Sequence, residues 1–277
     1  MGGGVLIEIT SVHNPKIKSA AKLMNRRERD ASGQFLIEGQ REVQRALEMD
    51  FPIVSLFVCA HFMSSQEFAR VPPLFVGKGI EVFPCSETVF KKISYRENPD
   101  GFLAIALQKH RTLDELALLV RQKKNPLILV AEGIEKPGNL GTLLRSCDAC
   151  GVDALILSDK TTDVFNPNVV RSSVGTLFSI PIIEAEGQHI IDFLKENQIQ
   201  MAAATPEGAI PYTDYNFKRG VAVVIGTEHA GLSLLWKQAA DACLAIPMHG
   251  LADSLNVTVA ATVILYEALR QRHTSKP

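Results

Sequence analysis

The chain has 277 residues, of which 46% are apolar and 21% are charged, as in a globular protein of two domains or one large one. It contains neither an apolar run long enough to cross a bilayer nor a signal-peptide pattern, so we expect a soluble, cytoplasmic protein. The net charge of −1 conceals a balance of +4 in residues 1–125 and of −5 in residues 126–277. This asymmetry favours anion binding by the front half, but it is too small to indicate a nucleic-acid partner alone.

The cysteines and histidines do not suggest a metal or disulfide protein. Five cysteines, an odd number, are scattered along the chain, which argues against a disulfide framework. Cys147 and Cys150 have CxxC spacing, but no second pair of ligands follows them and no HExxH is present. We therefore interpret the pair as small buried side chains and expect no metal.

The first hundred residues predict a mixture of short helices and strands. Helical periodicity over 14–29 puts apolar residues on one side, and Lys18, Lys22, Arg26 and Arg29 form a basic line along it. Strands are expected at residues 34–38, 54–59, 80–83 and 102–107, and a second helix at 42–49.

A change in rhythm then separates two domains. Residues 109–125 are polar and basic at their start, and we predict a linker there, between a domain of residues 1–108 and one of residues 126–277. Strands are expected at 127–131, 154–157, 180–183, 199–203 and 221–225, and helices at 139–150, 167–177 and 188–197. This alternation predicts an α/β fold with a mostly parallel sheet and flanking helices. The final helix, 256–272, is so apolar that it must be buried in its domain or against a partner subunit.

Three glycine-rich segments carry the polar residues most suited to chemistry. They read KPGNLGTLLR at 136–145, IGTEHAGLS at 225–233 and IPMHGLADSLNV at 246–257, and each puts glycines and a few polar side chains just after an apolar strand. Open parallel sheets bind ligands at the carboxyl ends of their strands. No GxGxxG, phosphate-binding loop or GxSxG accompanies them, which argues against dinucleotide, NTPase and hydrolase chemistry.

The polar residues of these segments also have ordinary structural explanations. Asn, Ser and Glu at helix starts are what capping predicts, and an arginine in a helix is often simply solvated. The candidates are Asn139, Arg145, Glu228, Ser254 and Asn256. Without further information, capping and catalysis remain equally good interpretations of them.

Taken together, the three segments resemble the signature of the SpoU-type (SPOUT superfamily) RNA ribose 2′-O-methyltransferases. FNPNVVRSSVG at 165–175 is also similar to the family, and residues 9–18 and 35–39 resemble its RNA substrate-binding domain. The match covers nearly the whole chain. His229 and Thr258 are mild departures, since the family commonly has other residues there.

The resemblance implies a knotted (trefoil), mostly parallel C-terminal sheet preceded by a smaller α/β RNA-binding domain. It also implies a homodimer with the site at the subunit interface and a pocket for S-adenosylmethionine formed by the second and third motifs. The residues it assigns to the cofactor are Thr205, Gly226, Ile246, Met248 and Leu255.

The implied chemistry is transfer of a methyl group to a ribose 2′-hydroxyl, with Arg145 in the leading role. Because arginine hardly ever loses its proton, we expect Arg145 to stabilise the developing alkoxide rather than to act as a base. The residues expected to orient it and the ribose are Asn139, Glu228, Ser254 and Asn256. The residues expected to contact RNA are Lys18, Lys22, Arg26, Arg29 and Arg171.

The resemblance does not decide which RNA is the substrate. We expect ribosomal RNA because the complete front domain is typical of that branch, which also includes enzymes that confer antibiotic resistance. The alternatives are a transfer RNA 2′-O-methyltransferase and a non-catalytic RNA-binding protein of the same fold. A nucleotide-dependent enzyme outside RNA biology fits less well, because phosphate-loop motifs are missing.

Overall fold

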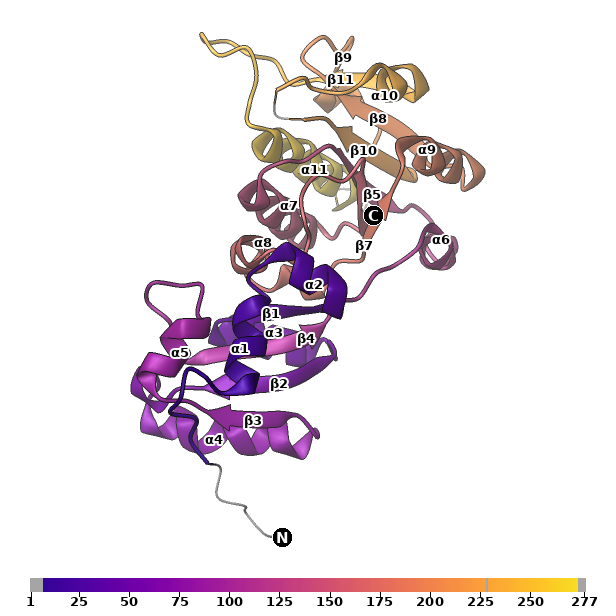
Figure 1. Cartoon of the computed structure of the whole chain (residues 1–277). Helices are drawn as coiled ribbons and strands as arrows, with labels where there is room; N and C mark the ends of the chain where they lie inside the picture. The colour runs from indigo at the N-terminus through magenta and orange to yellow at the C-terminus, as the bar shows by residue number, and fades with distance from the viewer. Residues whose placement is uncertain (1–6, 228, 274–277) are drawn as a thin grey trace. The chain divides into compact units, whose positions relative to one another are not determined.

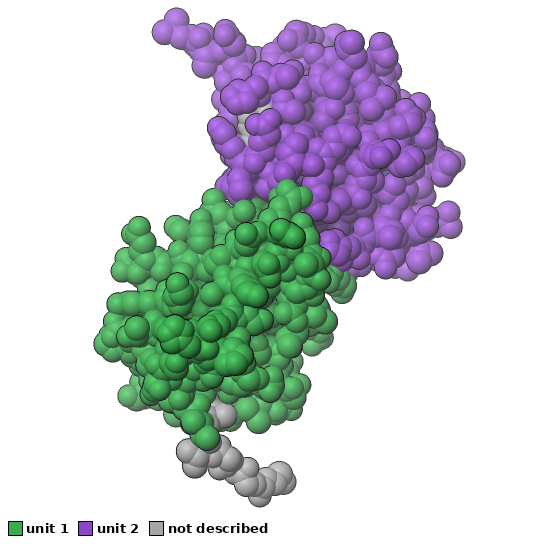
Figure 2. Space-filling view, in the orientation of Figure 1, with its two compact units in different colours: residues 1–109, 163–178 green, residues 110–162, 179–277 purple. Residues whose placement is uncertain are grey.

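The computed structural model describes residues 7–227 and 229–273, and these divide into two compact units. Figure 2 colours the units, which comprise residues 1–109 with 163–178, and residues 110–162 with 179–277. The first boundary lies next to the one predicted at residue 108. The segment 163–178 was predicted as part of the second domain, but it packs within the first unit.

The first unit is built on a four-stranded sheet in the order β1-β4-β2-β3 (Figure 1). β4 pairs antiparallel with β1 and β2, and β2 pairs parallel with β3. The strands are β1 (Gln34–Glu38), β2 (Ile53–Val58), β3 (Glu81–Pro84) and β4 (Phe102–Leu107). The helices are α1 (Pro15–Lys22), α2 (Arg26–Ser32), α3 (Gln40–Glu48), α4 (Ser65–Gly77), α5 (Glu87–Ile93) and α8 (Pro167–Ser173), with 3-10 turns η1 (Ala60–Phe62) and η2 (Thr176–Phe178).

The second unit is a seven-stranded parallel sheet in the order β7-β6-β5-β10-β8-β11-β9. Its strands are β5 (Leu127–Glu132), β6 (Ala154–Ser158), β7 (Ile182–Ala185), β8 (Gln200–Ala204), β9 (Ile210–Pro211), β10 (Val221–Ile225) and β11 (Ala242–Ala245). The helices are α6 (Leu113–Arg121), α7 (Pro137–Cys150), α9 (Gly187–Glu196), α10 (Leu234–Ala239) and α11 (Val257–His273), with the 3-10 turn η3 (Tyr212–Asp214). The predicted α/β class with a mostly parallel sheet is thereby confirmed.

Both faces of this sheet are covered, as its apolar strands require. β5, β6 and β10 are buried along their whole length, which explains why they read as continuous apolar runs. Trp236, the only tryptophan of the chain, is fully buried in the core that the sheet forms with α6, α9 and α10. Cys147 and Cys150 are buried free thiols, and burial raises the pKa of Cys150 to about 11.

The C-terminal helix α11 is fastened at both ends within the second unit. Near its start, the Thr262 and Ser146 hydroxyls lie 2.6 Å apart, which joins α11 to α7. Near its end, the Arg272 guanidinium donates to the carbonyls of Asn125 (2.7 Å), Phe217 (2.9 Å) and Arg219 (2.7 Å). Five donors in a rigid fork let one arginine hold backbone from two distant segments.

The predicted helix over 14–29 is wrong, because the chain breaks it at Asn25. The Asn25 side chain accepts a hydrogen bond from Arg27 N–H (2.9 Å) and caps α2, so α1 ends at Lys22. The basic line is broken at the same point. Lys18, Lys22 and Arg26 are exposed, but Arg29 points inward.

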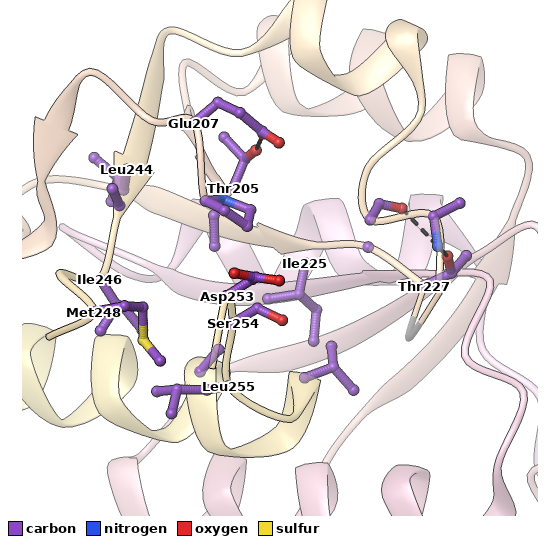
Figure 3. Close-up of a pocket in the computed structure, with 18 of the residues that line it drawn as sticks. Thr205, Glu207, Ile225, Thr227, Leu244, Ile246, Met248, Asp253, Ser254 and Leu255 are labelled. Carbon is purple, nitrogen blue, oxygen red and sulfur yellow. Dashed lines mark hydrogen bonds between the residues drawn. The ribbon is translucent and has the colours of Figure 1, made fainter. Parts of the chain in front are cut away.

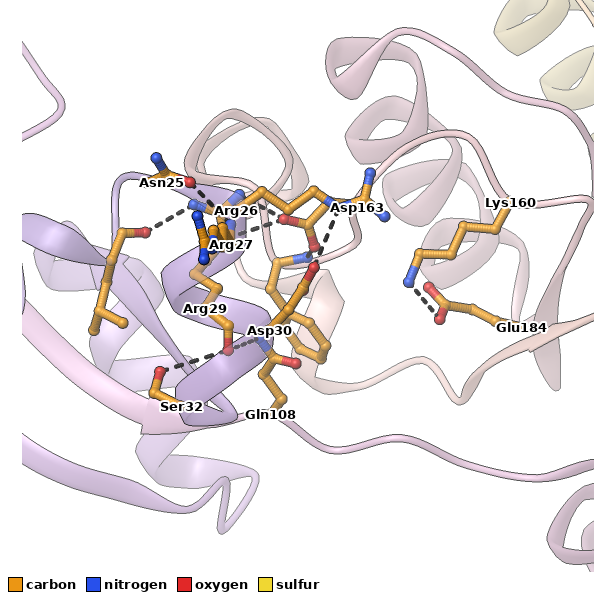
Figure 4. Close-up of polar contacts among 12 residues, drawn as sticks. Asn25, Arg26, Arg27, Arg29, Asp30, Ser32, Gln108, Lys160, Asp163 and Glu184 are labelled. Carbon is orange, nitrogen blue, oxygen red and sulfur yellow. Dashed lines mark hydrogen bonds and ion pairs between the residues drawn. The ribbon is translucent and has the colours of Figure 1, made fainter.

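Arg29 is 2% exposed and makes a buried ion pair with Asp163 (Nη2 to Oδ2, 2.5 Å; Figure 4). Its Nη1 also donates to the carbonyls of Leu23 (2.7 Å) and Met24 (2.9 Å), where α1 ends. Asp163 in turn accepts from the backbone N–H of Phe165 (2.9 Å). Arg29 is therefore unable to contact phosphate, and its prediction as an RNA-binding residue is corrected to a structural role that holds segment 163–178 in the first unit.

We expect Arg29→Ala to destabilise the first unit by about 3–5 kcal/mol, because it leaves the Asp163 carboxylate buried without its partner. Arg26→Ala is the matched control, since Arg26 makes an exposed pair with Asp30 at 3.5 Å, worth less than about 1 kcal/mol. Hydrogen exchange of peptides from β1 and β4 measures the difference. Equal protection in the two variants would contradict this assignment.

Candidate active site

A cavity of about 440 Å³ lies at the carboxyl ends of the central strands of the second unit. β8, β10 and β11 are neighbouring parallel strands, so the loops that follow them meet at one edge of the sheet. Those loops and the approach to α11 supply the lining. Thr205, Gly226, Ile246, Met248 and Leu255, all predicted from the sequence, lie in it together with Ser254 (Figure 3).

The loop after β10 depends on close contact between backbones at Gly226. A Cβ on Gly226 would lie 2.1 Å from the carbonyl carbon of Gly231 and 2.3 Å from Leu232 N. The turn is closed by Thr227, whose N–H donates to Gly231 O (3.0 Å) and whose Oγ1 accepts from Ala230 N (2.9 Å). Only glycine fits at 226 without moving this wall of the cavity. Glu228, a predicted catalytic residue, lies outside the described residues.

The end of β5, four residues before the first motif, is joined to the second motif. The buried carboxylate of Glu132 accepts a hydrogen bond from Ser233 N (2.8 Å), at the start of α10. Gly133 has φ +59°, and a Cβ there would lie 2.8 Å from Thr227 Cγ2. Glu132 was not among the predicted site residues, although an acidic residue that ends a fully apolar strand is a recognisable signal.

The cavity is also lined by charged side chains that were not predicted from the sequence. Asp253, Glu207 and Lys237 are among its lining residues. The Thr205 hydroxyl donates to the Glu207 carboxylate, whose Oε2 lies 3.8 Å from Lys237 Nζ. The hydrogen bond from Thr205, the N–H of Glu207 itself and the nearby Lys237 lower the pKa of Glu207. The Thr-Pro-Glu-Gly turn directly after a strand could have indicated Glu207.

The cavity suits a molecule that is partly apolar and carries positive charge. Ile225, Leu244 and Met248 offer apolar walls, while the Asp253 and Glu207 carboxylates suit hydroxyl and ammonium groups. Its volume falls within the roughly 300–1,000 Å³ typical of cofactor sites. These residues therefore fit S-adenosylmethionine, which has an adenosine portion, an amino acid end and a sulfonium.

The structure does not bring the first-motif residues into this cavity. Asn139 and Arg145 lie on α7, where Asn139 is half-buried and Arg145 is exposed, and neither is among the lining residues. Asn139 is the third residue of the helix, after Lys136 at the cap position and Pro137, so the capping interpretation of Asn139 is wrong. Among the described residues, Arg145 makes no hydrogen bond or ion pair.

Of the predicted third-motif residues, one caps a helix and another lines the cavity. Asn256 Oδ1 accepts from the backbone N–H (2.9 Å) and the hydroxyl (2.7 Å) of Thr258, so it does cap α11. Ser254 is exposed and lines the cavity. Arg171 is exposed on α8, which belongs to the first unit rather than to the second as predicted.

A parallel α/β sheet with a cofactor-sized cavity at its strand ends defines the general class of protein, and comparison with known proteins defines the family. Residues 126–266 match the model of the SpoU rRNA methylase family, and residues 14–104 match the MRM3-like substrate binding domain. The chain belongs to the SpoU rRNA methylase family, so the resemblance seen in the sequence is confirmed.

Three relatives match over almost their whole length. The 23S rRNA (guanosine(2553)-2′-O)-methyltransferase RlmP of Bacillus subtilis is 30% identical over 94% of this chain and 98% of its own. A crystal structure of an AdoMet-bound rRNA methyltransferase from Sinorhizobium meliloti superposes with a TM-score of 0.87 at 30% identity, covering 96% of this chain and 98% of that one. The crystal structure of the SpoU methyltransferase AviRb from Streptomyces viridochromogenes in complex with AdoMet superposes with a TM-score of 0.83 at 29% identity. The superposition covers 95% of this chain and 100% of that one.

We expect Gly226→Ala to weaken S-adenosylmethionine binding by roughly tenfold or more, because the added methyl group must push the 226–232 loop from its position. Gly138→Ala is the matched control, since a Cβ at Gly138 meets nothing within 4 Å. Calorimetric titration gives both affinities, and unchanged Trp236 emission establishes that each variant is folded. Equal affinities would exclude the Gly226 loop as a cofactor-binding wall.

Proposed function

We propose that this protein is an S-adenosylmethionine-dependent RNA methyltransferase that modifies a ribose 2′-hydroxyl in large-subunit ribosomal RNA. The observation that carries the proposal is the cavity at the ends of β8, β10 and β11, in a chain that aligns over 94% and 91% of its length with two named 23S rRNA 2′-O-methyltransferases. We further propose that the protein acts on ribosomal RNA in the cytoplasm, the location expected from the sequence.

S-adenosylmethionine would supply the methyl group, carried on a positively charged sulfur that makes it open to nucleophilic attack. Gly226, Ile246, Met248 and Leu255 would hold it largely through the backbone and apolar contact, with Thr205 at the edge. Glu207 and Asp253 extend the predicted set, because a carboxylate accepts hydrogen bonds from ribose hydroxyls or an ammonium group.

Arg145 would act on the RNA. A ribose hydroxyl must lose its proton as it attacks, and a fixed guanidinium stabilises the resulting negative charge. Asn139, Glu228, Ser254 and Asn256 would orient the ribose and the guanidinium. For Asn256 only the amide NH₂ would serve this role, because its Oδ1 already caps α11.

The proposal includes a homodimer and a trefoil knot. Arg145 and Asn139 lie outside the cofactor cavity of their own chain, so a second copy that presents its α7 would complete the site. The exposed side chains of Val259 and Tyr266 on α11 favour such an interface. The return of α11 from the β11 end to pack on α7 is in keeping with a knotted path.

On the first unit, the exposed side chains of Lys18, Lys22, Arg26 and Arg171 would contact phosphates of the RNA. Neutralising them is then expected to weaken RNA binding and to flatten its dependence on salt. Arg29 has no part in this surface.

The direct test is methyl-labelled S-adenosylmethionine incubated with unmodified 23S ribosomal RNA or transfer RNA, followed by digestion to nucleosides. We expect label in a 2′-O-methyl nucleoside from the ribosomal RNA. Label in transfer RNA alone would retain the reaction and refute the substrate. Cofactor binding without label in any RNA would favour the non-catalytic alternative.

We expect Arg145→Ala to lower turnover by about 100-fold or more, as the loss of a donor to a developing oxyanion does, while the affinity for S-adenosylmethionine stays the same. Single-turnover methyl transfer and calorimetry measure the two effects separately. Parallel losses of rate and of cofactor affinity would refute this separation of roles.

Co-expression of Arg145→Ala with Gly226→Ala tests where Arg145 acts. If Arg145 serves the cavity of the partner subunit, a mixed dimer has one intact site, and part of the activity returns. If it serves its own cavity, both sites of the mixed dimer are damaged, and no activity returns at S-adenosylmethionine concentrations too low to saturate Gly226→Ala.

A further inference from the structure

A loop of the first unit, residues 94–101 between α5 and β4, is held by buried charges that the proposed reaction does not use. Glu38, at the end of β1, is 7% exposed, and its carboxylate accepts from the backbone N–H groups of Tyr95 (2.7 Å) and Arg96 (3.2 Å). The Ser94 hydroxyl donates to the same carboxylate. Three successive residues of the loop are thus fixed by one acid.

Arg96 fastens the loop to the start of α3. Its Nη2 donates to Glu38 O (3.0 Å) and lies 3.1 Å from Oε2 of Glu42, which is 2% exposed. Asp100, at the other end of the loop, accepts from Gln40 N (2.9 Å), the first residue of α3. Both ends of the loop are therefore tied to the β1–α3 turn.

The turn has no room for a side chain at Gly39. Its φ is +114°, and a Cβ would lie 2.2 Å from Glu42 Oε2 and 2.4 Å from Arg96 Nη2. Buried charges are a costly way to stabilise a surface loop, because desolvation offsets much of their attraction. What such a network does provide is a single loop shape, which is the requirement of a preformed binding surface.

Two of the exposed side chains on this loop and turn, Tyr95 and Arg41, have the chemistry of a nucleotide site, although Glu97, also exposed on the loop, is acidic. Tyr95 is 45% exposed although its backbone is fixed. The side chain of Arg41 is 62% exposed, and its Nη2 lies 3.7 Å from Oε1 of Glu42, the acid that also pairs with Arg96. An aromatic ring offers a face on which any base stacks, and a guanidinium offers a contact for phosphate. Glu42 links the two positions, because its carboxylate pairs both with Arg41 and with Arg96, the residue next to Tyr95 in the chain.

We propose that Tyr95 and Arg41 form a platform that binds an unpaired nucleotide of the RNA substrate, with the base stacked on Tyr95 and its phosphate on Arg41. This inference rests on the proposed function and extends it, because it adds a single-stranded element to what the enzyme recognises. Stacking on one residue tolerates every base, so the platform contributes affinity and register rather than sequence specificity.

Replacement of Tyr95 in the full-length protein tests the platform. Tyr95→Ala is expected to weaken binding of a 23S ribosomal RNA transcript by about 5- to 100-fold, Tyr95→Leu by nearly as much, and Tyr95→Phe hardly at all, because only phenylalanine keeps the ring. Filter binding measures these affinities without any methyl transfer. In the transfer assay, KM for RNA should rise for Ala and Leu, while the affinity for S-adenosylmethionine stays constant.

The phosphate contact has its own matched pair of variants. Arg41→Gln should reduce the salt dependence of RNA binding by about one counterion, whereas Arg70→Gln should not. Arg70 is an exposed arginine of the same unit, on α4, which packs on β2 and β3, whereas α3 packs on β1 and β4 toward the other edge of the sheet.

The outcomes separate this proposal from the proposed function. If the wild-type protein binds the transcript but transfers no methyl group, the proposed function fails and the Tyr95 series still decides on the platform. If the wild-type protein methylates RNA and Tyr95→Ala binds it as tightly as Tyr95→Phe does, the platform is refuted. Equal losses in the Phe and Ala variants would also refute it, since they would show that the ring is not what matters.

Discussion

The second unit depends on the anchoring of its last helix, because the segment before α11 forms one wall of the cavity. Residues 246–255 have no strand or helix of their own and connect β11 to α11. Their position is therefore set by the two anchors of α11, the hydroxyl contact between Ser146 and Thr262 and the carbonyl contacts of Arg272. Burial lowers the pKa of Arg272, but the guanidinium remains charged, which keeps this anchor in place at any physiological pH.

The same anchoring links the two halves of the proposed chemistry. α7 carries Arg145 and touches α11 through Ser146, the next residue along the chain. Asn256 caps α11 through Thr258, and Thr262 donates to the Thr258 carbonyl (2.6 Å). A short series of hydrogen bonds thus runs from the third motif to the helix of the first. A change in one motif can alter the placement of the other without touching the ligand.

Much of this could be predicted from the sequence because the buried parallel strands are short, apolar and regularly spaced. β5, β6, β8 and β10 fall within one residue of their predicted bounds. β11 was missed because its four residues, Ala-Cys-Leu-Ala, carry no β-branched side chain, and all but Leu244 are only half-buried. α4 was missed because Pro72 and Pro73 stand inside it, where proline normally argues against a helix.

The wrong prediction for Arg29 has a different origin, because local spacing in the sequence carries no information about contacts with distant residues. Spacing by three or four residues places side chains on one face of a helix only while the helix continues. Here the helix is interrupted, because Asn25 caps the start of a separate helix, α2. The partner that buries Arg29 lies 134 residues away at Asp163, in a segment that the alternation of strands and helices assigned to the other domain. Local periodicity has no access to such a contact. By contrast, the cavity residues were predicted through the resemblance of short glycine-rich motifs to those of a known family, and the parallel sheet explains why they meet, since it brings the strand ends together.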